Sequence, residues 1–195
     1  MPRQADMEKK AVVLLAEGFE EVEAVTPVDY LRRAGISVTV AALGESLAVK
    51  GARGISVNAD ITLNDFAAKQ NAAGILPDAI VIPGGMPGAA NIAASKAAAK
   101  LIGEMAAAGK LVCAICASPA LVLAPMGLLS GRKFTCYPGM EENVSGGQWT
   151  AESVAVDGNI VTSRGAGTAG LFSATVIACL LGKTEGDKIA KSVLL

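Results

Sequence analysis

Cys116 stands where an apolar run of strand length, residues 110–115, passes directly into a stretch of helical character, residues 116–123. A buried strand that turns at once into a helix leaves the residue at the turn exposed, as at a nucleophile elbow. A thiol at a helix N-terminus has a lowered pKa, so we expect a reactive thiolate at neutral pH. The alternative is a small buried hydrophobic residue, and the position between strand and helix argues against it.

Cys113 and Cys116 also form a C-x-x-C motif, which is typical of thioredoxin-like redox sites. In that motif the first cysteine opens a helix, whereas the apolar run places Cys113 within the strand. Three residues of extended chain separate the two α-carbons by roughly 10 Å, which exceeds the reach of a disulfide. We therefore disfavour a redox dithiol.

Three acidic residues, Glu20, Glu21 and Glu23, open a helix predicted at residues 20–34. Acids at a helix start are usually solvated partners of the helix dipole, and we assign that role to Glu20 and Glu21. Glu23 differs, because apolar residues surround it and because Pro27 lacks the N–H that would bond its carbonyl. A carboxyl turned toward the sheet would have a raised pKa and could act as a protonated donor.

Gly84 and Gly85 directly follow the apolar run at residues 78–82. Adjacent glycines allow close approach of the backbone and can present N–H groups to a developing oxyanion. An ordinary turn is the alternative, and neither phosphate-loop pattern is present there. Ligands in parallel sheets bind at the carboxyl ends of strands, so Glu23, Gly84, Gly85 and Cys116 are predicted to meet.

Strand-length apolar runs alternate with helical stretches along the chain, a pattern typical of parallel α/β proteins. The predicted strands are 11–16, 36–42, 55–60, 78–82, 110–115, 133–136, 152–156 and 159–162. The predicted helices are 20–34, 89–108, 116–123, 168–181 and 183–193. We expect a single domain at residues 9–195, preceded by a flexible extension at residues 1–8.

The composition excludes several classes of protein. Hydrophobic residues make up 52% of the 195 residues and charged residues 18%, so the chain can form a sizeable core. A net charge of −1 with no long basic run argues against a nucleic-acid partner. The absence of histidine removes the commonest metal ligand, and we predict no metal.

The apolar stretches and the cysteines indicate where in the cell the protein is expected to act. No apolar stretch approaches the ~20 residues that span a bilayer, so we expect no membrane association. Four cysteines in a chain of this size form no disulfide framework, which favours a reducing, cytoplasmic compartment.

Five motifs, in their order and spacing, resemble the ThiJ/PfpI superfamily. They are EGFEEVEA from Glu17, RRAG from Arg32, IPGG from Ile82, AICA from Ala114 and TSRGAGT from Thr162. The similarity is to the branch of the parkinsonism-associated protein deglycase and its bacterial relatives, and it covers nearly the whole chain. It implies a flavodoxin-like three-layer α/β sandwich with a mostly parallel central sheet, and a homodimer.

The resemblance also implies a catalytic centre. Cys116 matches the superfamily's elbow cysteine and Glu23 its partner acid. Gly84, Gly85 and the Ala117 amide match its oxyanion pocket. These assignments coincide with the residues that the strand ends are predicted to bring together.

Three further residues are assigned supporting roles by the resemblance. Arg53 matches an arginine that reaches the neighbouring subunit's site, and Arg164 matches a second arginine near it. Tyr137 stands where several active members carry a histidine, so no cysteine–histidine pair exists, which argues against the protease activity claimed for some relatives.

The activity that this resemblance implies is cofactor-independent detoxification of small dicarbonyls or early glycation adducts, of glyoxalase III or protein deglycase type. The Cys116 thiolate would add to the aldehyde and Glu23 would move the proton. The alternative is an oxidative-stress sensor or redox-regulated chaperone, in which Cys116 is oxidised with little or no turnover. A thiamine-pathway enzyme ranks last, because no phosphate or thiazole site is legible.

Overall fold

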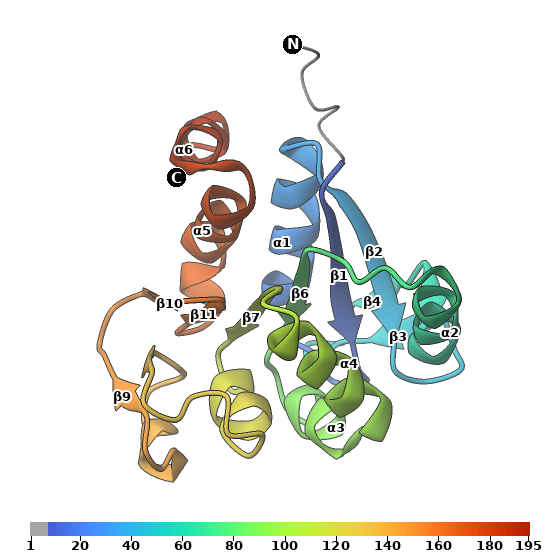
Figure 1. The fold of residues 1–195 in the computed structure, drawn as a ribbon, viewed down its shortest axis with the longest axis horizontal. Coiled ribbons are helices and arrows are strands. Elements are labelled where there is room, and N and C mark those ends of the chain that lie inside the picture. Colours follow the sequence, from blue (N-terminus) through green and yellow to red (C-terminus); the bar gives the residue numbers. More distant parts are fainter. Residues whose placement is uncertain (1–7) are drawn as a thin grey trace.

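A central seven-stranded sheet organises the chain (Figure 1). The structure is a computed structural model that describes residues 8–195. The strands of the sheet are β1 (Lys10–Leu15), β2 (Ser37–Ala42), β5 (Ile61–Thr62), β6 (Ala79–Ile82), β7 (Leu111–Ile115), β10 (Val154–Asp157) and β11 (Ile160–Ser163). Their order is β10-β11-β7-β6-β1-β2-β5, and only the edge pair β10 and β11 is antiparallel.

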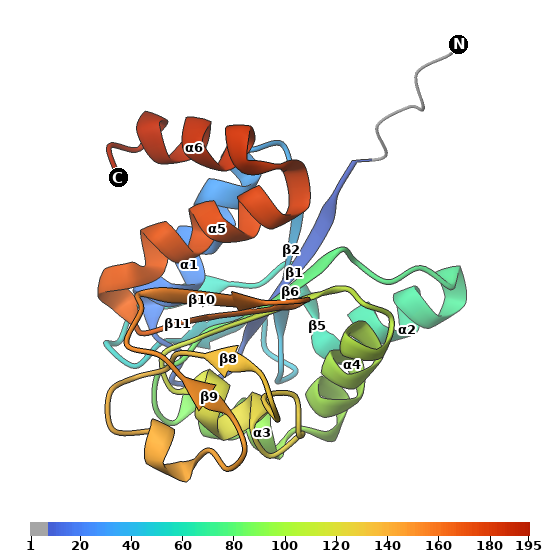
Figure 2. The same cartoon turned by 60° about the vertical axis from the view of Figure 1, so that its left-hand side comes forward.

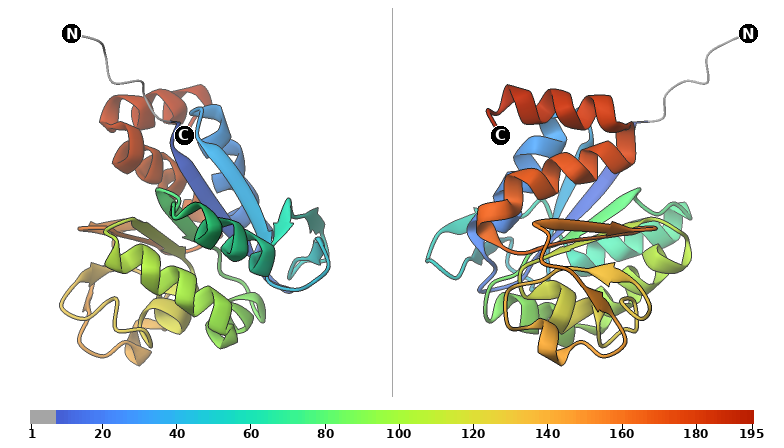
Figure 3. Two further views of the ribbon diagram at one scale, coloured as in Figure 1. Left: turned by 45° about the vertical axis from the view of Figure 1, so that its right-hand side comes forward. Right: turned by 90° about the vertical axis from the view of Figure 1, so that its left-hand side faces the viewer.

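Helices cover both faces of this sheet. They are α1 (Glu21–Arg33), α2 (Leu63–Ala73), α3 (Gly88–Ala94), α4 (Lys96–Ala107), α5 (Ala169–Leu181) and α6 (Lys183–Ser192). Helices α1, α5 and α6 lie on one face, and α2, α3 and α4 lie on the other (Figures 2 and 3). The predicted three-layer α/β sandwich with a mostly parallel sheet is confirmed.

Alternation along β1 explains how one strand serves two cores. Successive side chains of a strand point to opposite faces of the sheet. Val12 and Leu14 pack against the layer of α2 and α4, whereas Ala11 and Val13 pack against α1, α5 and α6. A continuous apolar run is therefore required here, since both faces are buried.

Several short elements lie outside the central sheet. They are the pair β3 (Ala48–Lys50) and β4 (Ser56–Asn58), the pair β8 (Lys133–Phe134) and β9 (Gln148–Trp149), 3-10 turns at Glu141–Asn143 and Ala166–Thr168, and a π-helical turn at Pro119–Leu123. The strand predicted at residues 55–60 is thus shorter, and it pairs with β3 alone.

The helix prediction was wrong in two places. Helix α2 was missed, although Thr62 accepts a hydrogen bond from the Asp65 N–H (3.1 Å) at its start and Gly74 ends it at φ +64°. The single helix predicted at residues 89–108 is two, because Ser95 adopts an extended backbone and caps α4 through the Ala98 N–H (3.2 Å). Both are capping signals in the sequence.

The extension predicted at residues 1–8 falls almost wholly outside the described residues. Glu8, the first residue described, is exposed. Within residues 8–195, no helix is both long and apolar enough to cross a membrane.

Candidate active site

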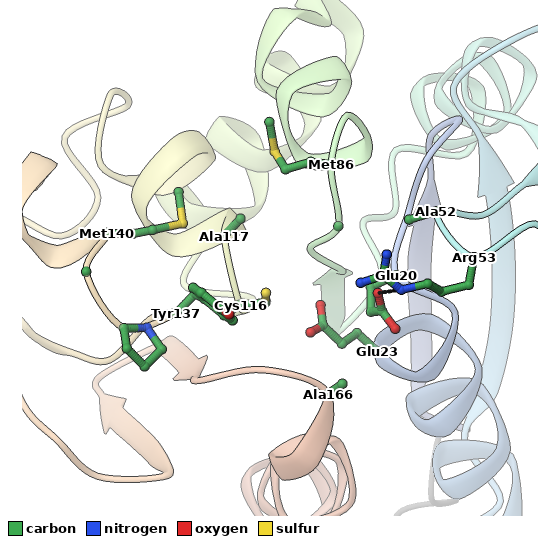
Figure 4. A pocket seen from close by; sticks show the side chains of 13 residues that line it. Glu20, Glu23, Ala52, Arg53, Met86, Cys116, Ala117, Tyr137, Met140 and Ala166 are labelled. Atoms are coloured by element: carbon green, nitrogen blue, oxygen red, sulfur yellow. Dashed lines mark ion pairs between the residues drawn. The ribbon is translucent and has the colours of Figure 1, made fainter.

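Three neighbouring strands deliver the predicted site residues to one edge of the sheet. Strands β7, β6 and β1 lie side by side and run in parallel, so their carboxyl ends meet. Cys116 follows β7, Gly84 and Gly85 follow β6, and the first turn of α1 after β1 carries Glu23. Figure 4 shows Cys116 and Glu23 facing each other across this edge. The predicted convergence is therefore observed.

Cys116 occupies a tight turn between strand and helix. Its φ of +64° is left-handed, a conformation that costs a residue with a side chain roughly 1–2 kcal/mol. Two backbone hydrogen bonds hold it: its N–H donates to the Ser163 carbonyl (2.9 Å), and its carbonyl accepts from the Tyr137 N–H (2.8 Å). The turn places the half-buried thiol at the base of an open cavity.

Gly84 fits against this turn because it lacks a side chain. A Cβ added there would lie 2.6 Å from Cys116 Cβ and 2.7 Å from Glu23 Oε2. The Gly84 N–H donates to Glu23 Oε2 (2.9 Å), so the glycine loop fixes the carboxyl. The buried Ser118 hydroxyl donates to the Pro83 carbonyl (2.6 Å) and ties the loop to the elbow.

Glu23 is buried, with only 1% of its surface exposed. Burial raises the pKa of this carboxyl from 4.5 to about 7, against the opposing hydrogen bonds from the Gly84 N–H and the Cys116 side chain. The nearby charge of Glu20 raises it further. Glu23 therefore exchanges a proton near neutral pH, as the sequence predicted for an acid turned toward the sheet.

The lowered pKa expected for Cys116 is wrong. Burial raises the pKa of the thiol to about 12, and the charge of Glu23 and the hydrogen bond with it act in the same direction. The N–H groups of Gly85 and Ala117 lower it by less. Burial and Glu23 therefore outweigh the N–H groups at the start of the helical segment, which is a π-helical turn at Pro119–Leu123.

Cys116 and Glu23 thus compete for one proton. Two negative charges in one desolvated site repel each other, so near neutral pH the pair carries at most one negative charge. The thiolate is favoured when Glu23 holds the proton, and three groups then face the sulfur: the Glu23 carboxyl and the N–H groups of Gly85 and Ala117. The arrangement suits a nucleophile beside an acid–base group.

A cavity of about 650 Å³ opens above the sulfur. Its lining residues are Glu20, Glu23, Ala52, Arg53, Gly85, Met86, Cys116, Ala117, Tyr137, Pro138, Gly139, Met140 and Ala166. Sequence reasoning missed Met86 and Met140, since no motif marks them, although Met86 directly follows Gly85.

The supporting residues are placed differently from one another. Tyr137 and Arg53 line the cavity, and Arg53 Nε lies 4.0 Å from Glu20 Oε2 at its mouth. Arg164 does not line it; its guanidinium donates to the Ala151 carbonyl (3.3 Å). The prediction that Arg53 reaches a partner subunit's site concerns an assembly and stays a prediction.

Glu21 corrects the sequence-based assignment of a solvated acid. Only 6% of its surface is exposed, and Oε1 accepts the N–H groups of Arg53 (2.7 Å) and Ile55 (3.3 Å). The carboxyl therefore anchors the loop that carries Arg53 to the cavity.

The four cysteines are all free. Cys113 lies in β7 as predicted, and it is buried, as is Cys136, whereas Cys179 is exposed. Within the described part of the chain, no three His, Cys, Asp or Glu side chains gather in a way that could hold a metal ion.

The match to a protein family is extensive. The model of the DJ-1/PfpI family matches residues 9–179. The chain belongs to this family. It is 40% identical to Protein DJ-1 homolog B of Arabidopsis thaliana over 184 residues, which cover 94% of this chain and 41% of that relative. The chain thus spans less than half of the plant protein's length.

Other family members match over most of their own length. A protein named as a deglycase from Pyrococcus horikoshii is 33% identical over 157 residues, covering 80% of this chain and 89% of that protein. The crystal structure of a mutant DJ-1 superfamily protein from Salmonella typhimurium is 39% identical, with a TM-score of 0.88 over 95% of this chain and 98% of that one. The DJ-1/PfpI fold therefore spans nearly all described residues.

Proposed function

We propose that this chain is a cysteine-dependent enzyme that detoxifies reactive dicarbonyls or early glycation adducts without a cofactor. Cys116 is the nucleophile and Glu23 its acid–base partner. The observation that carries this proposal is the pairing of the thiol with a buried acid whose pKa is about 7, at the base of an open cavity. The deglycase name of the Pyrococcus relative supports it.

The first step is addition of sulfur to the aldehyde. With methylglyoxal, the Cys116 thiolate forms a bond to the aldehyde carbon, and the carbonyl electron pair moves to oxygen. The N–H groups of Gly85 and Ala117 lie where they can stabilise this oxyanion, with Gly84 supporting them by fixing Glu23. Glu23 supplies the proton that completes the hemithioacetal.

Proton transfer between carbons follows. The Glu23 carboxylate removes the hydrogen from the sulfur-bearing carbon, giving an enediol, and a proton returns at the neighbouring carbon. The product is a lactoyl thioester of Cys116. Water hydrolyses it to lactate and regenerates the thiol, so the balance is methylglyoxal plus water to lactic acid.

Supporting roles fall to three residues. Tyr137 takes the place of histidine beside the cavity, Arg53 stands at its mouth, and Arg164 holds the chain after β11. Without histidine, Glu23 carries the acid–base work, and we expect slow turnover.

Assembly, location and extent are part of the same proposal: the homodimer follows from the family resemblance, and the cytoplasmic location from the cysteine content. The single domain spans residues 9–195, acts in the cytoplasm, forms a homodimer and binds no nucleic acid or membrane. Exposed Val22 (47%) and Val25 (46%) on α1 supply an apolar face for a second copy. Light scattering at micromolar concentration is expected to give twice 19.6 kDa, and a 19.6 kDa particle would overturn the dimer.

One assay tests the proposed chemistry. Lactate formation from methylglyoxal is followed for the wild-type protein and Cys116→Ser, with the sulfinate content of Cys116 measured by mass spectrometry. We expect many turnovers per chain from the wild type and none from Cys116→Ser. If the wild-type protein forms no lactate and Cys116 is oxidised stoichiometrically, the result would instead support the sensor or redox-regulated chaperone.

A further inference from the structure

The cavity above Cys116 has two unlike sides. Figure 4 shows Met140 on the opposite side of Cys116 from Glu20 and Arg53, with Tyr137 overlapping Cys116 in this view and Met86 at the top of the view. One side is therefore charged, and the other is aromatic and apolar. We call the set Met86, Tyr137 and Met140 the apolar wall.

The apolar wall leaves large side chains open to solvent. Met86 is 57% exposed and Tyr137 is 54% exposed, and both line the same cavity. Met140 is partly buried against the hydrophobic core, which fixes one end of the wall. Exposed apolar side chains gathered around a cavity mark a binding surface, and methionine adapts to aromatic partners through its polarisable sulfur.

The size of the cavity argues for a substrate larger than a three-carbon dicarbonyl. A volume of about 650 Å³ lies in the middle of the range, roughly 300–1,000 Å³, found for sites that bind drug-sized molecules. Methylglyoxal, with five non-hydrogen atoms, would leave the apolar wall in contact with water. A substituent that covers the wall would gain the free energy of burying it.

The geometry of addition directs that substituent toward the wall. The attacked carbon becomes tetrahedral, with bonds to sulfur, oxygen, hydrogen and the keto carbon. The oxygen faces the N–H groups of Gly85 and Ala117, and the hydrogen must face Glu23 if that residue is to remove it. The keto carbon stays within reach of Glu23, which returns the proton to it, and its substituent is left to extend along the cavity, away from Glu23.

The charged side offers little to an anionic substituent. Arg53 already faces Glu20, with Nε and Oε2 4.0 Å apart, and the guanidinium is largely solvated. A neutral group on the apolar wall therefore fits the cavity better than a carboxylate or phosphate at its mouth.

We propose that the apolar wall is a subsite for an aryl or bulky alkyl group, so that the preferred substrate is an aryl or long-chain α-oxoaldehyde. The reaction class rests on the proposed function, whereas the subsite does not. The chemistry is unchanged: phenylglyoxal plus water would give mandelic acid through the same thioester.

The test separates binding at the wall from turnover. Cys116 is alkylated with iodoacetamide or with its N-phenyl derivative, which share a leaving group, and each rate is divided by the rate for glutathione. We expect the corrected rate with the phenyl reagent to be at least about tenfold higher in the wild type. In steady state, the ratio of kcat/KM for phenylglyoxal over methylglyoxal is expected to exceed one by a similar factor.

Variants identify the residues. Met86→Ala and Met140→Ala are each expected to reduce the alkylation preference at least about threefold. Tyr137→Phe keeps the aromatic ring, so this variant is expected to retain the alkylation preference. Ile75→Ala serves as the matched control, since Ile75 is 59% exposed and lies outside this cavity.

Each outcome decides one proposal. Equal corrected rates with the two reagents, or the same loss in Ile75→Ala as in Met86→Ala, would overturn the subsite. A phenyl preference that disappears in both methionine variants but comes without any lactate or mandelate would support the subsite and overturn the proposed function.

Discussion

Two buried carboxyls, two residues apart on α1, are used in different ways. Residues two apart point about 200° apart around a helix, so Glu21 and Glu23 face different neighbours. Glu21 accepts two backbone N–H groups from the loop of Arg53, whereas Glu23 accepts one, from Gly84, and shares a proton with the thiol of Cys116. Backbone donors make a carboxylate a structural anchor, while a titratable partner beside a cavity makes it an acid–base group.

The largest expected effect is on turnover. Glu23→Gln keeps an acceptor for the Gly84 N–H and a donor for sulfur, but it cannot exchange a proton. We expect lactate formation to fall by at least about 100-fold, the usual scale for a lost acid–base group, while Cys116 is still alkylated. Glu21→Gln is the matched comparison, with a loss of at most a few-fold, and equal losses in the two variants would contradict the division of roles.

The next effect is on stability, and it depends on pH. Because the pKa of Glu23 is raised from 4.5 to about 7, the folded state binds this proton more tightly than the unfolded state. The stabilisation by protonated Glu23 is fully present below about pH 4.5 and is lost as the pH rises through about 7.

The amide of Glu23→Gln stays uncharged at every pH, so this variant does not bury a negative charge when the pH rises. We expect its free energy of unfolding to exceed that of the wild type by on the order of 3 kcal/mol at alkaline pH, and the difference to disappear in acid. Urea denaturation at both pH values measures this. A pH-independent difference would contradict a buried, proton-exchanging Glu23.

A smaller effect is expected from Ser118, which ties the elbow to the glycine loop. Ser118→Ala removes the bond to the Pro83 carbonyl, and we expect about tenfold slower alkylation of Cys116 with a stability loss of about 1 kcal/mol. Ser173→Ala removes a similar buried bond, 2.7 Å to the Ala169 carbonyl within α5. Equal slowing in both variants would show that Ser118 acts through general stability.

The smallest effect is expected for Arg53→Ala, and comparing it with Glu21→Ala separates the two kinds of contact around Glu21. Arg53→Ala keeps the backbone N–H that Glu21 accepts and removes only an exposed ion pair, so stability is expected to change by less than about 0.5 kcal/mol. Glu21→Ala leaves two N–H groups without their partner and is expected to cost about 2 kcal/mol. Thermal unfolding of the two variants checks the order, and the reverse order would refute the anchor.

The strand ends and the acid–thiol pair were predictable from the sequence, because apolar runs, glycines and an elbow cysteine occur where a parallel sheet requires them. The direction in which the pKa of Cys116 shifts was not predictable, since it depends on burial and on a carboxyl that is distant in sequence. The burial of Glu21 was missed, because the packing of a loop against a helix leaves no periodic pattern in the sequence. The apolar wall was missed for a similar reason, since the exposure of Met86 in a loop leaves no such pattern either.

The central claim, that Glu23 moves the proton between the two carbons, is tested most directly in heavy water. Lactate formed from methylglyoxal in D₂O is examined by proton NMR. Because Glu23 faces an open cavity and exchanges its proton with solvent, we predict deuterium at C2 of most product molecules. Lactate that keeps the original hydrogen at C2 would show that this hydrogen does not pass through a solvent-exchanging Glu23, as in direct hydride transfer, and would contradict the account.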